Sequence, residues 1–198
     1  MALEALSELD QLQNILLSKS VKFGDFQLAS GQRSDVYVDC KPTTCNAAAM
    51  PLVGRVVLRK IRERGWLPEA VGGLLVGAEP IAFAVARESL EMQPQVNAFI
   101  VRKEAKPHGR QKAIEGIDPT ANCRVVVIDD VCTQGESTAL AIRNMQAAGM
   151  IVLGAICLVD REAGAAELLQ REFGIQLESV YKLSTLRAVH DARLVALA

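Results

Sequence analysis

The chain has 198 residues, of which 50% are hydrophobic and 23% are charged. It is therefore long enough for one domain with a full core, and too apolar to be mainly disordered. Its 22 Lys and Arg residues nearly balance 23 Asp and Glu residues, which argues against a broad basic surface for nucleic acid or an anionic membrane. The least polar stretch, residues 150–159, has half of the roughly 20 residues that a membrane span needs. The N-terminus is acidic, unlike a secretory signal, and the five cysteines form no C-x-x-C pair, so we expect a cytoplasmic protein with reduced thiols.

The first 40 residues predict one helix followed by two short extended pieces. Leucines at spacings of three and four indicate an amphipathic helix over residues 4–19. Residues 26–28 and 36–38 are expected to be extended, on either side of a turn at Ser30 and Gly31.

Beyond this point, apolar strands alternate with helices. Asn46 is expected to cap a helix that ends at Gly65. The inward face of this helix carries Val53, Val56, Val57 and Ile61. The predicted strands cover residues 70–76, 96–101, 124–128, 151–159 and 176–182. The predicted helices between them cover residues 80–90, 136–148 and 163–173. This alternation indicates an α/β fold with a mostly parallel sheet that is flanked by helices on both faces.

We therefore predict a single domain over residues 1–198. About residues 1–40 do not follow the alternating rhythm and are expected to form a small N-terminal lobe, here called the hood, while residues 41–198 form the core. Ligands of an open parallel sheet bind outside the carboxyl ends of its strands. The segments that follow the strands are therefore the first places to look for a site.

An acidic pair and a glycine-containing helix start follow the strand at residues 124–128. Asp129 and Asp130 precede a segment from Thr133 to Thr138 that is rich in hydroxyls and contains Gly135. Backbone N–H groups at a helix start suit a phosphate, whereas two carboxylates would repel it and instead suit a sugar diol or a hydrated Mg²⁺. The alternative is an ordinary strand-to-helix turn in which Asp130 or Thr133 only caps the helix.

A basic stretch, residues 101–110, follows the strand at residues 96–101. It contains five basic side chains, which are Arg102, Lys103, Lys106, His108 and Arg110. A cationic loop at a strand end suits a ligand with several phosphates, and it could close over a site and exclude water. The alternative is a solvated, charged surface loop.

The acidic segment resembles the phosphoribosyl pyrophosphate (PRPP) motif of the type I phosphoribosyltransferases. The resemblance implies that Asp129 and Asp130 bind the ribose hydroxyls of PRPP and contact Mg²⁺ through water. It further implies that the loop after them binds PRPP through its 5′-phosphate, with the residues Val131, Cys132, Thr133, Gln134, Gly135, Glu136 and Ser137. Residues 72–80 are similar to the pyrophosphate loop of this family.

The basic stretch is similar to the catalytic loop of the orotate-specific branch of this family. The resemblance implies a homodimer in which Arg102, Lys106 and His108 bind PRPP in the neighbouring subunit, while Lys103 acts within its own chain. Lys106 is the residue most expected to stabilise the leaving pyrophosphate. Residues 28–39 are similar to the lobe signature that covers the base. The residues implied to contact orotate are Tyr37, Thr133 and Arg161.

Two positions depart from the family pattern. Many members have a lysine where Ala29 and Val76 stand here, so the departures remove positive charge near the phosphates. The resemblance implies an enzyme that makes orotidine 5′-monophosphate and pyrophosphate from orotate and PRPP, with Mg²⁺ as cofactor, in UMP synthesis. Two alternatives remain open, a phosphoribosyltransferase for another base and a regulator that senses PRPP without turnover.

Overall fold

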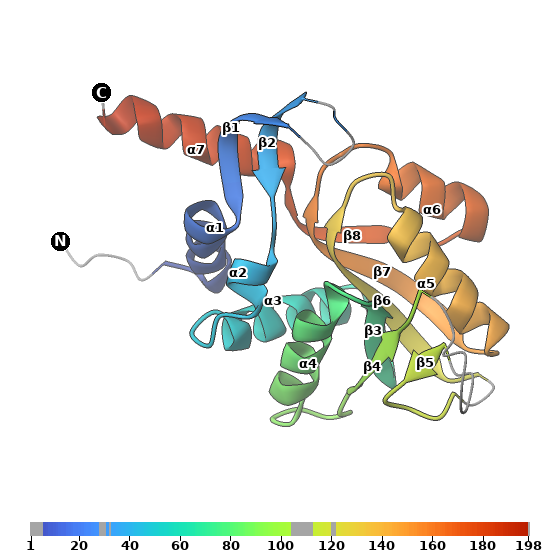
Figure 1. Cartoon of the computed structure of the whole chain (residues 1–198). Coiled ribbons are helices and arrows are strands. Elements are labelled where there is room, and N and C mark those ends of the chain that lie inside the picture. The colour runs from blue at the N-terminus through green and yellow to red at the C-terminus, as the bar shows by residue number, and fades with distance from the viewer. Residues whose placement is uncertain (1–5, 28–30, 32, 104–112, 120–121, 198) are drawn as a thin grey trace.

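The centre of the molecule is a six-stranded sheet in the order β5-β4-β3-β6-β7-β8 (Figure 1). The computed structural model describes residues 6–27, 31, 33–103, 113–119 and 122–197. The strands of the sheet are β3 (Ala70–Leu74), β4 (Asn97–Val101), β5 (Ile114–Glu115), β6 (Arg124–Cys132), β7 (Ile151–Asp160) and β8 (Leu177–Lys182). All neighbouring pairs are parallel except β4 and β5. The predicted mostly parallel α/β fold is therefore confirmed.

Helices cover both faces of this sheet (Figure 1). The helices are α3 (Met50–Glu63) and α4 (Ala78–Ser89) on one face, and α5 (Glu136–Ala147) and α6 (Ala165–Phe173) on the other. Alternate residues of β6 serve the two faces, because successive side chains of a strand point to opposite sides. Val126 and Ile128 join the core beneath α3 and α4, whereas Val125 and Val127 join the core beneath α5 and α6.

The helix after Asn46 begins later than the sequence predicts. The Asn46 side chain accepts hydrogen bonds from the backbone N–H groups of Ala48 and Ala49, so it closes a turn that precedes the helix. Helix α3 starts at Met50, where Pro51 occupies its first turn and needs no N–H partner. The cap at Asn46 was therefore wrong, while the end before Gly65, with its φ of 66°, is confirmed.

The strand that carries the acidic pair is longer than predicted. It runs to Cys132 instead of ending at Ile128, because β7 offers a paired backbone as far as Asp160. Asp129 and Asp130 are therefore the last part of a strand and not the first part of a turn. Since they are consecutive residues of a strand, their side chains leave the sheet on opposite faces. The other predicted strands and helices of the core end within two residues of the observed ends.

The N-terminal segment forms a second, two-stranded sheet. Helix α1 (Glu8–Lys19) leads into the antiparallel strands β1 (Val21–Gln27) and β2 (Arg33–Val38), which are longer than the predicted extended pieces. Only part of the predicted turn, Gly31, lies within the described residues. A short helix, α2 (Lys41–Thr44), follows β2.

The C-terminal helix α7 (Leu183–Leu197) was not predicted, and it lies beside the hairpin (Figure 1). The rings of Phe23 and His190 are 4.5 Å apart, and the Arg187 guanidinium lies 4.8 Å from the Phe23 ring centroid. The two ends of the chain therefore support each other.

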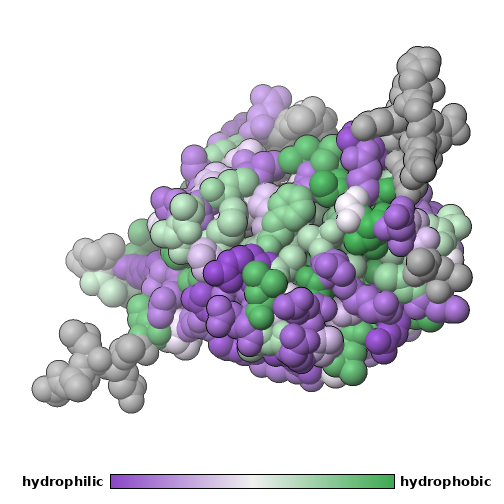
Figure 2. Space-filling view, turned by 90° about the horizontal axis from the view of Figure 1, so that it is seen from below, coloured by the Kyte–Doolittle hydropathy of each residue, from purple (hydrophilic) through white to green (hydrophobic). Residues whose placement is uncertain are grey.

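The surface seen from below mixes hydrophobic and hydrophilic side chains (Figure 2). Several large hydrophobic side chains on or beside α4 are exposed, namely Val76, Phe83, Leu90 and Met92. Within the described residues, no helix combines the length and the apolar character that a membrane span requires.

Candidate active site

A small pocket lies where β6 leads into α5. It has a volume of about 170 Å³ and is lined by Asp129, Val131, Cys132, Thr133, Gln134, Gly135, Glu136 and Ser137. These are the predicted PRPP-binding residues of the acidic segment except Asp130, so the structure brings them together. Gly135 precedes the first turn of α5 with a φ of 83°, a left-handed conformation that glycine adopts without strain. The helix start thus presents N–H groups to the pocket, which suits an anion.

Asp129 is held on the α5 side of β6. Its carboxylate accepts a hydrogen bond of 2.7 Å from the Thr138 hydroxyl and one of 3.0 Å from the backbone N–H of Asp130. Only 8% of Asp129 is exposed, and burial raises the pKa of its carboxyl group to about 6. Asp129 is therefore a fixed hydrogen-bonding group at the wall of the pocket.

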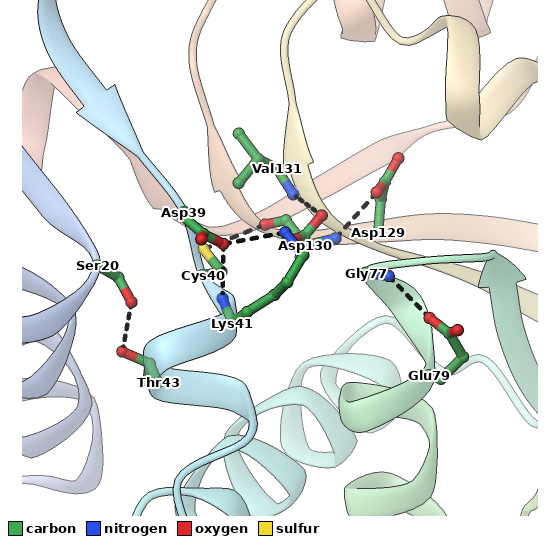
Figure 3. A network of polar contacts seen from close by, with 10 residues as sticks. All are labelled: Ser20, Asp39, Cys40, Lys41, Thr43, Gly77, Glu79, Asp129, Asp130 and Val131. Carbon is green, nitrogen blue, oxygen red and sulfur yellow. Dashed lines mark hydrogen bonds and ion pairs between the residues drawn. The ribbon is translucent and has the colours of Figure 1, made fainter.

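Asp130 points to the other side of the strand, toward α2 and α4 (Figure 3). Its carboxylate accepts a 2.9 Å hydrogen bond from the backbone N–H of Val131. Burial raises the pKa of Asp130, and the nearby Lys41 ammonium opposes that shift. The two acids of the pair therefore have different partners, and a ligand that uses both has to reach across the end of β6.

The predicted pyrophosphate loop lies against Asp130. A Cβ atom added to Gly77, whose φ is 150°, would be 2.7 Å from Oδ1 of Asp130. The N–H of Gly77 donates to the Glu79 carboxylate at 2.7 Å. Val76, which stands where many family members have a lysine, is 70% exposed, so this loop meets solvent with an uncharged side chain.

The basic stretch is described only at its start. The Arg102 guanidinium forms a forked pair with the Glu115 carboxylate, at 2.7 Å and 3.3 Å, and this pairing raises the pKa of Arg102. Lys103 is exposed. The predicted catalytic residues Lys106 and His108 lie outside the described residues. In this structure Arg102 is therefore directed to β5.

The predicted orotate-binding residues come from three segments. Arg161 directly follows β7, and its backbone N–H donates to the Cys132 carbonyl at 2.8 Å, which ties it to the loop that contains Thr133. Tyr37 lies on β2 and is 44% exposed; its ring centroid is 5.9 Å from that of Phe26. Thr133 and Arg161 thus follow neighbouring strands at the same edge of the sheet, while Tyr37 belongs to the β1–β2 hairpin.

Sequence reasoning missed two residues that hold the acidic pair, Thr138 and Lys41. Thr138 is fully buried on α5, and a hydroxyl on the apolar face of the predicted helix was the available signal. Lys41 lies two residues after the lobe signature, and its nearness to Asp130 depends on tertiary structure that the sequence pattern does not contain. Among the described residues, no group of three His, Cys, Asp or Glu side chains could hold a metal ion.

The fold, with its acid-bearing strand end and anion pocket, is that of the type I phosphoribosyltransferases. No protein-family model matches the chain. The orotate phosphoribosyltransferase of Aquifex aeolicus is 38% identical over 182 residues, which are 90% of this chain and 97% of that protein. Two crystal structures of the Mycobacterium tuberculosis H37Rv enzyme are similar to this chain, and each alignment covers 91% of this chain and 99% of the other. The complex with Fe(III) dicitrate gives a TM-score of 0.80 at 36% identity, and the complex with PRPP gives 0.76 at 31%. This chain belongs to the orotate phosphoribosyltransferase family.

Proposed function

We propose that the pocket at the start of α5 binds PRPP, whose phosphoribosyl group this enzyme transfers to orotate, forming orotidine 5′-monophosphate and pyrophosphate in de novo UMP synthesis. The observation that carries the proposal is the pocket itself. It combines the N–H groups of a helix start with the fixed carboxylate of Asp129 on its wall. A phosphate at one end of a ligand and hydroxyls at the other match these two halves.

The reaction breaks the bond from the anomeric carbon of PRPP to pyrophosphate and forms a bond from that carbon to N1 of orotate. Positive charge grows on the ribose and negative charge on the pyrophosphate, so the protein acts mainly through placement and electrostatics. The negative charge of orotate lies on its carboxylate, so N1 loses its proton as the new bond forms, and the leaving pyrophosphate can accept that proton. The Asp129 and Asp130 carboxylates would accept hydrogen bonds from the ribose hydroxyls, and Thr133 and Arg161 would contact orotate.

Lys106 is proposed as the main catalytic residue, with Arg102, Lys103 and His108 as further PRPP ligands of the basic stretch. In this proposal the forked pair of Arg102 with Glu115 is released when the basic stretch closes over PRPP. A planar guanidinium suits a phosphate as well as a carboxylate, so the same side chain can serve both states.

Mg²⁺ is proposed as the cofactor, carried by the oxygens of PRPP. When bound, it would stabilise negative charge on the pyrophosphate. The acids at the end of β6 fit this role, because they are two carboxylates on opposite faces of a strand and suit contact through water more than a closed metal site. Asp129 and Asp130 would hold waters of the hydrated ion.

A homodimer is also proposed, with the basic stretch of one subunit reaching the site of the other. The exposed side chains of Val76, Phe83 and Leu90 support it, since apolar groups of this size favour burial against a partner. Helix α4 begins at Ala78, directly after the loop that packs on Asp130. A second copy seated on α4 would therefore lie next to the site.

The hood, residues 1 to about 40, is proposed to cover the base through the hairpin that carries Tyr37, within a single domain of residues 1–198. The support of α7 for this hairpin is consistent with a lobe that keeps its shape while ligands enter. A cytoplasmic location is proposed because all five cysteines are free thiols, which suits a reducing compartment.

The decisive experiment measures the orotate absorbance when Mg-PRPP is added to the purified protein. We expect the absorbance to fall and pyrophosphate to appear. If orotate is not consumed, a panel of other bases with PRPP tests the alternative base specificity. If PRPP binds by calorimetry while no base is consumed, the protein is a sensor and the proposal is wrong.

A further inference from the structure

Residues 39–41 form a connector between the hairpin and the acidic end of β6 that is tightly held on both sides. The backbone N–H of Asp39 donates to the Ser20 carbonyl at 2.9 Å. The hydroxyls of Ser20 and Thr43 share a buried hydrogen bond of 2.7 Å. Cys40 is fully buried, and its thiol donates to the backbone carbonyl of Asp130 at 3.7 Å. The position of the connector relative to Asp130 is therefore fixed.

Lys41 runs from this connector toward Asp130 (Figure 3). Its Nζ lies 3.0 Å from Oδ1 of Asp39, and its backbone N–H donates to the same oxygen at 3.1 Å. Asp39 thus binds both the backbone N–H and the side-chain ammonium of Lys41. The Lys41 ammonium also attracts the Asp130 carboxylate. One ammonium is therefore paired with the Asp39 carboxylate and lies near the Asp130 carboxylate of a different segment of the chain.

The charge at this position affects the binding of an anionic substrate. Asp39 and Asp130 together would repel the phosphates of PRPP if nothing compensated them. The neighbouring loop offers no compensation from Val76, which is uncharged and points to solvent. Among the residues that the structure describes, Lys41, Asp39, Cys40 and Asp129 are charged or titratable groups near the Asp130 carboxylate, and Lys41 is the cation in this set.

We propose that Lys41 is a positioning residue for PRPP, which holds the Asp130 carboxylate in place and offsets the negative charge of Asp39 and Asp130. The inference rests on the proposed binding of PRPP at the end of β6. In this role Lys41 does not touch the substrate. It acts through Asp130, so its loss weakens PRPP binding more than it affects orotate or the chemical step.

The test is a set of variants assayed as whole protein with Mg-PRPP by calorimetry and with steady-state kinetics. For Lys41→Met we expect the Kd for Mg-PRPP to rise roughly five- to tenfold, with KM for orotate and kcat within about twofold. This change in Kd is small for the loss of one charge of an ion pair, because 48% of the Lys41 side chain is exposed and solvent screens the attraction. Lys41→Arg keeps the charge and should bind Mg-PRPP as the wild type does.

A charge-balanced variant separates electrostatics from structure. Asp39→Asn/Lys41→Met removes one negative and one positive charge, and it should recover most of the lost affinity. If affinity depended only on the packing of this connector, the double variant would bind no better than Lys41→Met. Lys19→Met, on the exposed last turn of α1, is the matched control for loss of a positive charge and should leave the Kd unchanged.

The outcomes distinguish this inference from the proposed function. Wild-type affinity in Lys41→Met, or no recovery in the charge-balanced variant, overturns the role of Lys41 if Asp129→Asn/Asp130→Asn has lost PRPP binding. If the variant with both acids replaced still binds Mg-PRPP like the wild type, the PRPP site itself is wrongly placed. Should Lys41→Met fail to fold, as judged by circular dichroism, the charge-balanced variant and Lys41→Arg decide the matter.

Discussion

Asp129 and Asp130 show how two adjacent residues of the same type acquire different properties. Asp129 lies against Thr138 on the α5 side, whereas Asp130 lies against Gly77 and near Lys41 on the other side of β6. The residue types and their order led to the prediction of a diol-binding pair. Their separation could not be predicted, because it follows from the extension of β6, which depends on pairing with β7.

Asp129 should make folding stability depend on pH. Its pKa is about 6 in the folded chain against the ordinary value of 3.8, so the folded state binds the proton more tightly than the unfolded state. Its contribution to stability is therefore fully present below about pH 3.8 and is lost as the pH rises through about 6. At pH 7 the ionised group costs about 3 kcal/mol on this basis.

We therefore expect Asp129→Asn to unfold at a higher urea concentration than the wild type at pH 7. Its free energy of unfolding should be higher by up to about 2 kcal/mol, because the weaker hydrogen bonds of the amide offset part of the gain. The difference should shrink as the pH falls toward 4. Urea titrations between pH 4 and 8 measure it, with the exposed Asp191→Asn as control. A constant difference across this range would show that Asp129 does not titrate as described.

Lys106 offers a second prediction for a single residue. As the proposed donor to the leaving pyrophosphate, it should matter most in the transition state, so Lys106→Ala should lower kcat by roughly 10²–10³. The exposed Lys19→Ala serves as the control in the same steady-state assay. Turnover near that of the wild type would remove Lys106 from the mechanism.

Among the elements, the apolar strands and the helices between them could be predicted because each is encoded by its own periodicity. The last residues of β6 could not, since an Asp-Asp pair locally favours a turn and only the β7 ladder keeps it extended. Strand β5 has just two residues, Ile114 and Glu115, held by pairing with β4. Helix α7 could not be predicted either, because it is held by the hairpin and its exposed Leu194 and Val195 hide the amphipathic pattern that would indicate a helix.

The close packing around β3 predicts that this strand does not tolerate a side chain at Gly73. A Cβ atom added to Gly73 would be 1.9 Å from the Ile128 carbonyl oxygen and 2.8 Å from Cβ of Ala78. Both neighbours are close to the backbone and cannot move aside cheaply, so Gly73→Ala should lower the free energy of unfolding by about 3 kcal/mol or more. Urea denaturation measures the loss.

Gly65→Ala is the matched control for this change. An added Cβ meets open space there, and its φ of 66° leaves only the left-handed backbone penalty, about 1 kcal/mol. Equal losses in the two variants would mean that β3 tolerates a side chain at Gly73.

At the scale of the whole molecule, the site depends on segments that are far apart in the chain. The acidic pair is held by α5 on one side and by the connector of residues 39–41 on the other. The family resemblance led to the prediction of the segments that are proposed to form the site. The contacts that join them, such as the Cys40 thiol with the Asp130 carbonyl, follow from tertiary structure and had no signal in the local pattern.

A shared site would have a consequence that single chains cannot show. If the basic stretch acts on the neighbouring subunit, a Lys106→Ala chain keeps an intact PRPP site but offers its partner an impaired lid. An Asp129→Asn/Asp130→Asn chain has the opposite fault. A heterodimer of the two contains one site in which both parts are intact, so mixing two inactive proteins in equal amounts should restore about a quarter of wild-type activity.

The mixing experiment needs proof that subunits exchange. Differently tagged chains, mixed under mild denaturation and refolded, give heterodimers that tandem affinity purification isolates for assay. Purified heterodimers should then have about half of wild-type activity, because one of their two sites is complete. If they are confirmed by mass and remain inactive, the basic stretch serves its own subunit.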